Sequence, residues 1–329
     1  MWAMIIALAL LAAGMGIWAI LLSRQKRSLA RALQKSEEKR TEAEGRERIY
    51  DAMLPARLCG LFQDGKLEKL CIGAEKSVRA AVLSVNIHGF EAIVRQQDAA
   101  GIFRFVNQIL SLAVPCILYQ EGEIDKFVNA GFLAFFLNSP ERALKAAVSV
   151  CEALSEAGIK EEYAIGLSYG DVKVGVAGHE RRFGIMTVSD TTGLADFLQE
   201  MAPRYRARIL ITGSLKSQIP DFEKNYNGRY LGTVYLKAAG ESEELYDVYD
   251  GDEAEDKNGK RKTRLLFEKG VDLFKEGKYY DARLHFIEVL KANRMDGAAK
   301  EYLHLCDQYS QAVSGGTMLE KNFSYLEIY

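Results

Sequence analysis

Five cysteines and four histidines could supply the nitrogen and sulfur ligands of a zinc site, and the cysteine thiols could do redox chemistry. Zinc sites need Cys or His ligands at short, regular spacing. His88 and His179 have no such partner nearby in the sequence, so we expect them in loops or at strand ends. The cysteines form no CxxC pair, which predicts reduced thiols that lie mostly in the core: Cys59, Cys71, Cys116, Cys151 and Cys306.

The segments between residues 57 and 250 alternate short apolar strands with amphipathic helices, which predicts an α+β fold with a ferredoxin-like core. Helices are expected at 99–119, 140–156 and 190–201. Strands are expected at 80–86, 124–128, 132–137, 163–169, 172–177, 208–212, 230–237 and 244–249.

The composition is that of a folded protein with balanced charge. Of 329 residues, 43 are Lys or Arg and 45 are Asp or Glu, a net charge of −2. No general positive field therefore favours a nucleic-acid partner. Hydrophobic residues make up 48% and only 5 residues are Pro, so most of the chain should be ordered.

Residues 1–22 carry no charge, and Arg24, Lys26 and Arg27 follow directly. At about 1.5 Å per residue this run can cross a hydrocarbon layer of about 30 Å. The basic residues follow the apolar run rather than precede it, which favours an uncleaved anchor over a signal peptide. We therefore expect one transmembrane helix in the inner or plasma membrane, with the rest of the chain in the cytoplasm.

The charge-rich residues 23–56 predict a juxtamembrane helical stalk. Lys, Arg and Glu interleave around Leu29, Ala32 and Leu33, with no Pro before Pro55. The apolar stripe is thin, so a dimeric coiled coil and a solvated stalk are both open.

The carboxy-terminal part begins with a polar stretch at 251–262, interpreted as a linker. Residues 263–310 then predict two amphipathic helices with a turn near Gly277 and a third helix from about Asp296. They resemble a tetratricopeptide repeat, with the small residues Gly270 and Ala282 allowing close helix packing. About three repeats are usually needed for independent stability, so we expect this part to pack on the preceding domain, on a second copy or on a protein partner. The tail at 311–329 is either disordered or a docking peptide, and a protein partner is expected at 263–329.

Several segments together resemble the catalytic domain of class III nucleotide cyclases. They are VLSVNIHGF at 82–90, EGEIDKFVNAGFLAFF at 121–136 and GDVKVGVAGHERRFGIMTVSDTTGLADFL at 170–198, and MLP at 53–55 resembles the start of such a domain. The resemblance covers residues 57–250 and implies that Gly170, Gly175 and Gly178 serve the backbone of a hairpin. No Lys-Ser/Thr pair or Rossmann spacing follows these glycines to make a phosphate cradle.

The resemblance also shows that the metal ligands of the family are missing. A class III cyclase uses two divalent metals held by two carboxylates, at the positions of Asn86 and Ala130 in this sequence. An Asn oxygen is a weak neutral ligand, and an Ala methyl supplies none. Asp125 is nearby, but we expect it to face away from Lys126 on a regular strand. No metal or cofactor is therefore expected, and Mg²⁺ or Mn²⁺ would matter only if the chain were an active enzyme.

The positions that stabilise the transition state in the family also differ. The family has Asn and Arg where this sequence has Gly193 and Phe197. Loss of one preorganised donor typically lowers a rate by about 10²–10³.

Lys126 and Asp190 match the Lys and Asp that select the base in the family. A Lys donor and an Asp acceptor complement the ring nitrogen and the amine of adenine. The resemblance thus implies a residual purine pocket that could hold ATP. The alternative is that Lys126 is a solvated charge and Asp190 the N-cap of a helix from Thr191.

These observations lead to a pseudo-cyclase that acts as a regulatory or scaffolding subunit in intracellular signalling, as a homodimer or heterodimer through the cyclase-like domain. One alternative is an active adenylate cyclase, most simply a heterodimer whose partner supplies the metal aspartates. The other is an ATP-sensing module.

Overall fold

The computed structural model describes residues 18, 25–26, 33–37, 39–45, 56–62, 71–160, 162–236 and 240–314. The chain divides into two units, Met1–Ala56 and Arg57–Tyr329. In the first unit the described residues before Ala56 are helical, and Arg40 and Glu44 form an ion pair one turn apart, with 2.8 Å between Nε and Oε1. Of the expected transmembrane helix only Trp18 is described. That prediction therefore lies outside the described residues, as does the tail from residue 315.

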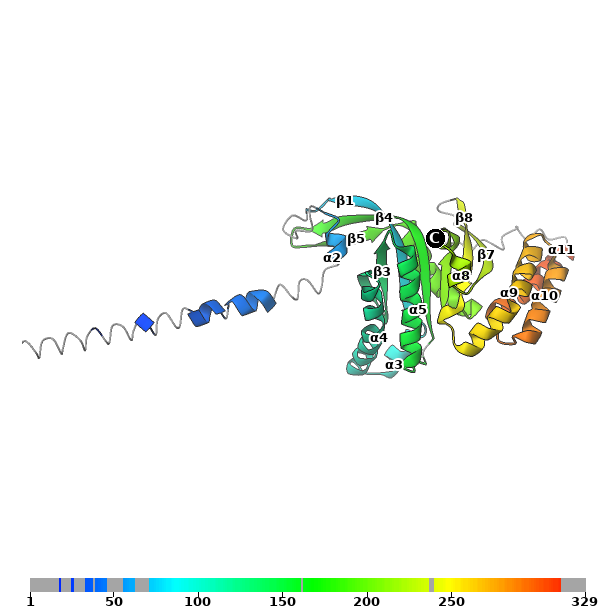
Figure 1. Ribbon diagram of the computed structural model, residues 1–329, viewed down its shortest axis with the longest axis horizontal. Coiled ribbons are helices and arrows are strands. Elements are labelled where there is room, and N and C mark those ends of the chain that lie inside the picture. Colours follow the sequence, from blue (N-terminus) through cyan, green and yellow to red (C-terminus); the bar gives the residue numbers. More distant parts are fainter. Residues whose placement is uncertain are drawn as a thin grey trace, which may run out of the picture. The chain divides into compact units, whose positions relative to one another are not determined.

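The second unit is built on one mixed sheet with the strand order β2-β3-β1-β4-β6-β8-β7, while β5 pairs with β4 (Figure 1). The central strand β1 is antiparallel to both of its neighbours, and β4 and β6 are parallel. The α+β prediction is confirmed. The strands are β1 Glu75–Ile87, β2 Glu123–Val128, β3 Gly131–Leu137, β4 Tyr163–His179, β5 Arg182–Val188, β6 Ile209–Thr212, β7 Gly228–Leu236 and β8 Glu241–Val248.

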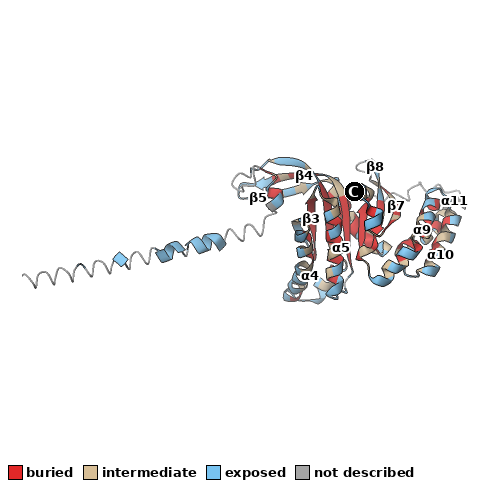
Figure 2. Cartoon of the chain, viewed as in Figure 1, coloured by how far each residue is buried: buried red, intermediate tan, exposed pale blue. Residues whose placement is uncertain are grey.

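Helices cover both faces of the sheet. Alternate residues of β1 point to opposite faces. Leu83 packs in a core with α4 and α5, whereas Val82 packs in a second core with Ala195 of α6. The buried residues follow the sheet and the inner sides of these helices (Figure 2). The helices are α2 Ala56–Cys59, α3 Phe90–Gln96, α4 Ala99–Tyr119, α5 Pro140–Glu156, α6 Asp190–Met201, α7 Gly213–Lys216, α8 Phe222–Asn225, α9 Ala254–Lys275, α10 Tyr279–Ala292 and α11 Gly297–Ser314, with short 3₁₀ turns η3 Ala202–Tyr205 and η4 Tyr249–Gly251.

Within the described residues one helix, α4, is long and apolar enough to cross a membrane by length and composition alone. Its residues Ile109, Ala113 and Ile117 are buried in the core beneath the sheet. A core helix passes the same test, so α4 says little about membrane attachment. The amino-terminal anchor stays a prediction.

Two strand predictions need correction. The segments expected as separate strands at 163–169 and 172–177 form the single long strand β4, because its ladder with β1 continues without interruption from Tyr163 to Gly175. Strand β5 was not predicted. It pairs antiparallel with the outer half of β4, from Lys173 to His179.

The linker prediction for 251–262 is wrong. Helix α9 begins at Ala254, and Lys260 in its second turn is almost fully buried. The Lys260 ammonium lies 2.9 Å from Asp247 of β8 and 2.7 Å from Asp252. The polar residues of this segment are thus partly interior residues with charged partners, which is why their composition resembled that of a linker.

Helices α9, α10 and α11 pack directly on the sheet domain. They share one apolar core with α6, β6, β7 and β8. A buried ionic network crosses this contact, because Arg229 of β7 binds Asp247 at 3.0 Å and Asp296, just before α11, at 2.6 Å. Of the three packing surfaces considered from the sequence, the structure shows the preceding domain. A relation to tetratricopeptide repeats stays a prediction.

Candidate functional site

The position of the first expected metal ligand, Asn86, lies near the end of β1. Ser84, two residues earlier and on the same face, donates a hydrogen bond from Oγ to Oδ1 of Asp196 in α6, over 2.6 Å. Asn86 is half-buried and opposite Ala164 of β4. Asp196, which the sequence analysis did not consider, is thus a carboxylate that Ser84 holds against β1.

The second expected ligand position, Ala130, lies in the turn between β2 and β3. Asn129 has a left-handed backbone, with φ of 54°, and Ala130 is 0% exposed. A Cβ added to the next residue, Gly131, would lie 1.9 Å from the carbonyl oxygen of Val85. The turn is thus packed tightly against β1, with a methyl group where a ligand would have to be.

Gly193 and Phe197 both lie on α6, one turn apart. A Cβ at Gly193 would meet nothing within 4 Å, so this place is open. Phe197 is half-buried and packs against the apolar core that α6 shares with the carboxy-terminal helices. An aromatic ring thus takes part in core packing at the position of a transition-state cation.

The structure corrects the interpretation of Asp190 as a helix cap. The N-cap of α6 is Ser189, whose Oγ accepts a hydrogen bond from the backbone N–H of Thr192 at 3.1 Å. Asp190 is the first residue of the helix and is exposed, and Lys126 is exposed on β2. In the part of the chain that the structure describes, no ion pair joins Lys126 to Asp190.

Asp125 does not follow the regular alternation that was expected of it. The pairing of β2 with β3 shifts between Ile124 and Lys126, so Asp125 is an extra residue in the strand. Its Oδ2 accepts a hydrogen bond of 3.0 Å from Oγ1 of Thr187 in β5. Burial raises the pKa of Asp125, against the lowering effects of Thr187 and Lys126.

His88 and His179 contact the backbone of other residues, and Cys59, Cys151 and Cys306 are buried. His88 Nε2 lies 3.1 Å from the carbonyl oxygen of Gln199, and the backbone N–H of Arg181 donates to His179 Nδ1 at 3.4 Å. Burial raises the pKa of Cys306 to about 12, which disfavours the reactive thiolate. Among the described residues, no group of three or more His, Cys, Asp or Glu side chains is arranged to hold a metal ion.

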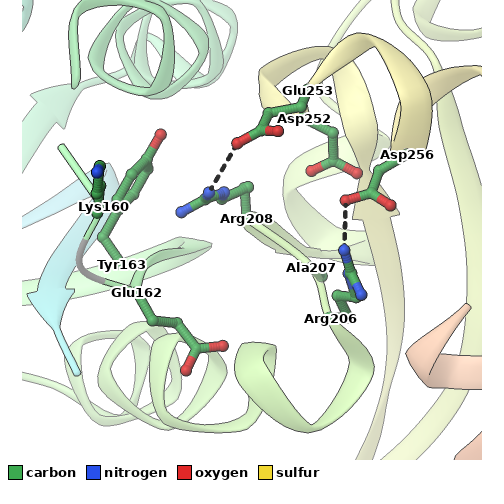
Figure 3. A pocket seen from close by; sticks show the side chains of 9 residues that line it. All are labelled: Lys160, Glu162, Tyr163, Arg206, Ala207, Arg208, Asp252, Glu253 and Asp256. Atoms are coloured by element: carbon green, nitrogen blue, oxygen red, sulfur yellow. Dashed lines mark hydrogen bonds and ion pairs between the residues drawn. The ribbon is translucent and has the colours of Figure 1, made fainter. Parts of the chain in front are cut away.

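A cavity of about 230 Å³ lies elsewhere, between the start of β4, the start of β6 and the start of α9 (Figure 3). Arg208 stacks on the ring of Tyr163 at 4.0 Å and lies 3.8 Å from Glu253, while Arg206 lies 3.3 Å from Asp256. The two arginines at its wall thus already have acidic partners. The lining residues are Lys160, Glu162, Tyr163, Arg206, Ala207, Arg208, Asp252, Glu253 and Asp256.

Several known proteins that are similar to this chain are adenylate cyclases. An adenylate cyclase specific to terminal differentiation, from Dictyostelium discoideum, is 24% identical over 273 residues, which are 80% of this chain and 13% of the relative. An adenylate cyclase from Anabaena cylindrica is 22% identical over 213 residues, 60% of this chain and 42% of the relative. The chain therefore spans less than half the length of these relatives. No protein-family model matches it.

The structure of a bacterial light-regulated adenylyl cyclase has the same fold, with a TM-score of 0.58 and 18% identity over 67% of this chain and 66% of that one. The sheet domain is thus similar in sequence to adenylate cyclases and has the fold of an adenylyl cyclase.

Proposed function

We propose that this chain is a cyclase-homology protein without cyclase activity, which acts as a regulatory or scaffolding subunit at a membrane. The proposal rests on one observation, which is the kind of side chain that occupies the expected catalytic positions. Ala130 is fully buried and offers only a methyl group, and Phe197 packs in an apolar core. A triphosphate bound there would lack both metal neutralisation and a cation for the reacting phosphate.

Apolar side chains exposed on β2 and β5 support dimerisation through the cyclase-like domain. The Asp125–Thr187 hydrogen bond joins these two strands. Apolar side chains that are exposed to solvent in a patch commonly mark protein–protein interfaces. The exposed residues are Phe127, Val128, Phe183, Met186 and Val188.

The direct test is to incubate the purified full-length protein with ATP or GTP and with Mg²⁺ or Mn²⁺, and to measure cyclic nucleotide by mass spectrometry. We expect none above the background of a no-protein control, because neither metal has its two carboxylates. Product that disappears in Lys126→Ala would contradict the proposal and favour the active enzyme.

The heterodimer alternative has its own test. Co-purification from the native membrane followed by mass spectrometry would identify a partner, and the assay would be repeated with that partner present. A catalytically complete cyclase as partner, with product that depends on Lys126, would favour an active heterodimer. Recovery of an unrelated protein that requires residues 263–329 would favour the scaffold.

A further inference from the structure

The cavity between the starts of β4, β6 and α9 has a buried carboxylate in its wall, that of Asp252 (Figure 3). The Asp252 side chain is only 3% exposed. Within the described part of the chain neither of its oxygens accepts a hydrogen bond, although Oδ2 lies 2.7 Å from the Lys260 ammonium. A buried carboxylate oxygen without a donor costs free energy, so Oδ1 is open to a donor in the cavity.

Lys260 cannot supply the donor for Oδ1. An ammonium group has three N–H groups. Besides its contact with Asp252 Oδ2, the Lys260 ammonium donates to the carbonyl oxygen of Arg206 at 3.1 Å and to Oδ1 of Asp247 at 3.2 Å. No N–H of Lys260 therefore remains for the second oxygen of Asp252.

The buried charges behind the cavity do not balance. The network has two cations, Arg229 and Lys260, in contact with three carboxylates, those of Asp247, Asp252 and Asp296. All five side chains are at most 3% exposed. One negative charge is thus in excess, and of the three carboxylates it is Asp252 that lines the cavity. A cation in the cavity would offset this charge where the network meets open space.

The other charged residues of the wall consist of three cations and three carboxylates. The two arginines lie 3.3 and 3.8 Å from acidic partners of their own, and among the described residues no ion pair joins either arginine to Asp252. An exposed lysine and an exposed glutamate add one charge of each sign. The excess negative charge of the wall is therefore that of Asp252. The six residues are Arg206 and Asp256, Arg208 and Glu253, and Lys160 and Glu162.

These features favour an organic ammonium ion over a metal ion. A divalent metal needs several oxygen ligands, and no group of three or more His, Cys, Asp or Glu in the described ranges is arranged to hold one. The volume of about 230 Å³ is many times the roughly 10–15 Å³ that one water molecule requires. A primary ammonium group can donate to Oδ1 of Asp252, while an attached alkyl chain occupies the remaining volume beside Ala207.

We propose that this cavity binds a small aliphatic amine, whose protonated primary amino group donates a hydrogen bond to Oδ1 of Asp252. The cavity does not include Asn86, Ala130, Gly193 or Phe197, so the inference does not rest on the proposed function. Strands β4 and β6 and the start of α9 all contribute to the wall. A bound amine would therefore stabilise the attachment of the carboxy-terminal helices to the sheet domain.

The test is isothermal titration calorimetry of the full-length protein, in mild detergent, with 1,4-diaminobutane as the probe. We expect saturable binding of one molecule per chain and a higher melting temperature in its presence. Tetramethylammonium has the charge but no N–H, and 1,4-butanediol has the alkyl chain but no charge, so neither should bind. No binding of 1,4-diaminobutane up to millimolar concentration, or equal binding of tetramethylammonium, would overturn the inference.

A substitution at Asp252 tests the contact itself. Asp252→Asn keeps the size of the side chain but removes its charge, so the dissociation constant of 1,4-diaminobutane should rise at least about tenfold. Asp272→Asn makes the same charge change at an exposed position near the end of α9 and should leave the dissociation constant unchanged. Equal dissociation constants of the wild type and Asp252→Asn would contradict the proposed contact.

A second substitution keeps the test decisive if Asp252→Asn does not fold. The Glu253 side chain is 69% exposed and makes no capping hydrogen bond to α9, so Glu253→Lys should preserve the fold. It places a cation at the wall of the cavity, and repulsion should raise the dissociation constant of the amine at least about fivefold. Glu253→Gln should have a smaller effect. An unchanged dissociation constant in Glu253→Lys would show that the amine binds elsewhere, and the inference would fail.

Discussion

Single residues occupy the two positions at which the resemblance to cyclases implies metal ligands. Asn86 retains an oxygen on the α6 side of β1, but Ala130 is enclosed in the core beside the tight contact of Gly131 with β1. A carboxylate introduced at position 130 would therefore be desolvated. Only a cation held with a second carboxylate could offset that cost.

We predict that Ala130→Asp lowers the free energy of unfolding by about 2 kcal/mol, the usual cost of burying an unpaired polar group. Adding Asn86→Asp should create a pair that binds Mn²⁺, so millimolar Mn²⁺ should raise the melting temperature of the double variant. Thermal unfolding with and without Mn²⁺ measures this effect. The single variant serves as the control, and an equal Mn²⁺ response of both proteins would contradict the prediction.

Sequence analysis located these residues but did not describe all their surroundings. The motif spacing was enough to find positions 86, 130, 193 and 197. It could not show that Asp125 lies at a bulge. A bulge depends on the pairing of β2 with β3 and is not visible in the alternation of polar and apolar residues along β2 itself. It also chose Asp190 over Ser189 as the N-cap, although both residue types cap helices well.

Among the elements, β3 and α6 each contain a glycine, and a Cβ would be crowded at the first glycine and free of contacts at the second. Gly131→Ala would place a Cβ 1.9 Å from the Val85 carbonyl oxygen and force β3 away from β1. We predict a loss of about 3 kcal/mol in unfolding free energy, at the upper end for overpacking.

The matched control for this substitution is Gly193→Ala. A Cβ at this helical position has no neighbour within 4 Å, and Ala favours a helix over Gly by about 1 kcal/mol, so the protein should become slightly more stable. Urea denaturation followed by circular dichroism would measure both variants. Equal effects of the two substitutions would show that the close approach at β3 is not rigid.

Apolar periodicity predicted most elements well, including α4 and α5 with the bounds that the structure shows. It failed where residue types gave a misleading signal. Residues 251–262 are polar, yet Lys260 is interior because Asp247 and Asp252 compensate its charge. Sequence alone does not reveal such pairing, because Asp247 and Lys260 are brought together only by the packing of α9 on the sheet.

At the scale of the whole folded unit, the sheet and the three last helices depend on each other. Arg229 and Asp296 are both 0% exposed in their side chains and are bound through two hydrogen bonds, at 2.6 and 3.1 Å. Oδ1 of Asp296 also accepts the backbone N–H of Ala299 in the first turn of α11. One carboxylate therefore fixes both the strand contact and the start of the helix.

We predict that Asp296→Asn lowers the unfolding free energy by about 3 kcal/mol at pH 7, because Arg229 loses a charged partner in the interior. Burial alone would raise the pKa of Asp296, but Arg229 lowers it below its usual value. A lowered carboxyl pKa adds stability above the unfolded value of about 3.9, and that stability is lost as the pH falls toward the folded pKa. Melting temperatures between pH 7 and pH 3 should fall less steeply below pH 4 in Asp296→Asn than in the wild type, and parallel curves would contradict this.

The buried pairing of Lys260 with Asp247 and Asp252 also limits where the chain can be divided. A recombinant fragment or a chimera that ends near residue 250, at the end of the segment that the sequence analysis compares with cyclases, would keep Asp247 in the interior and discard its cation. A fragment with this boundary would fold less stably, whatever protein it was joined to. Junctions before Arg57 and after Ser314 keep every one of these pairs within the same piece, so a segment with these ends can be moved between proteins with its buried charges still paired.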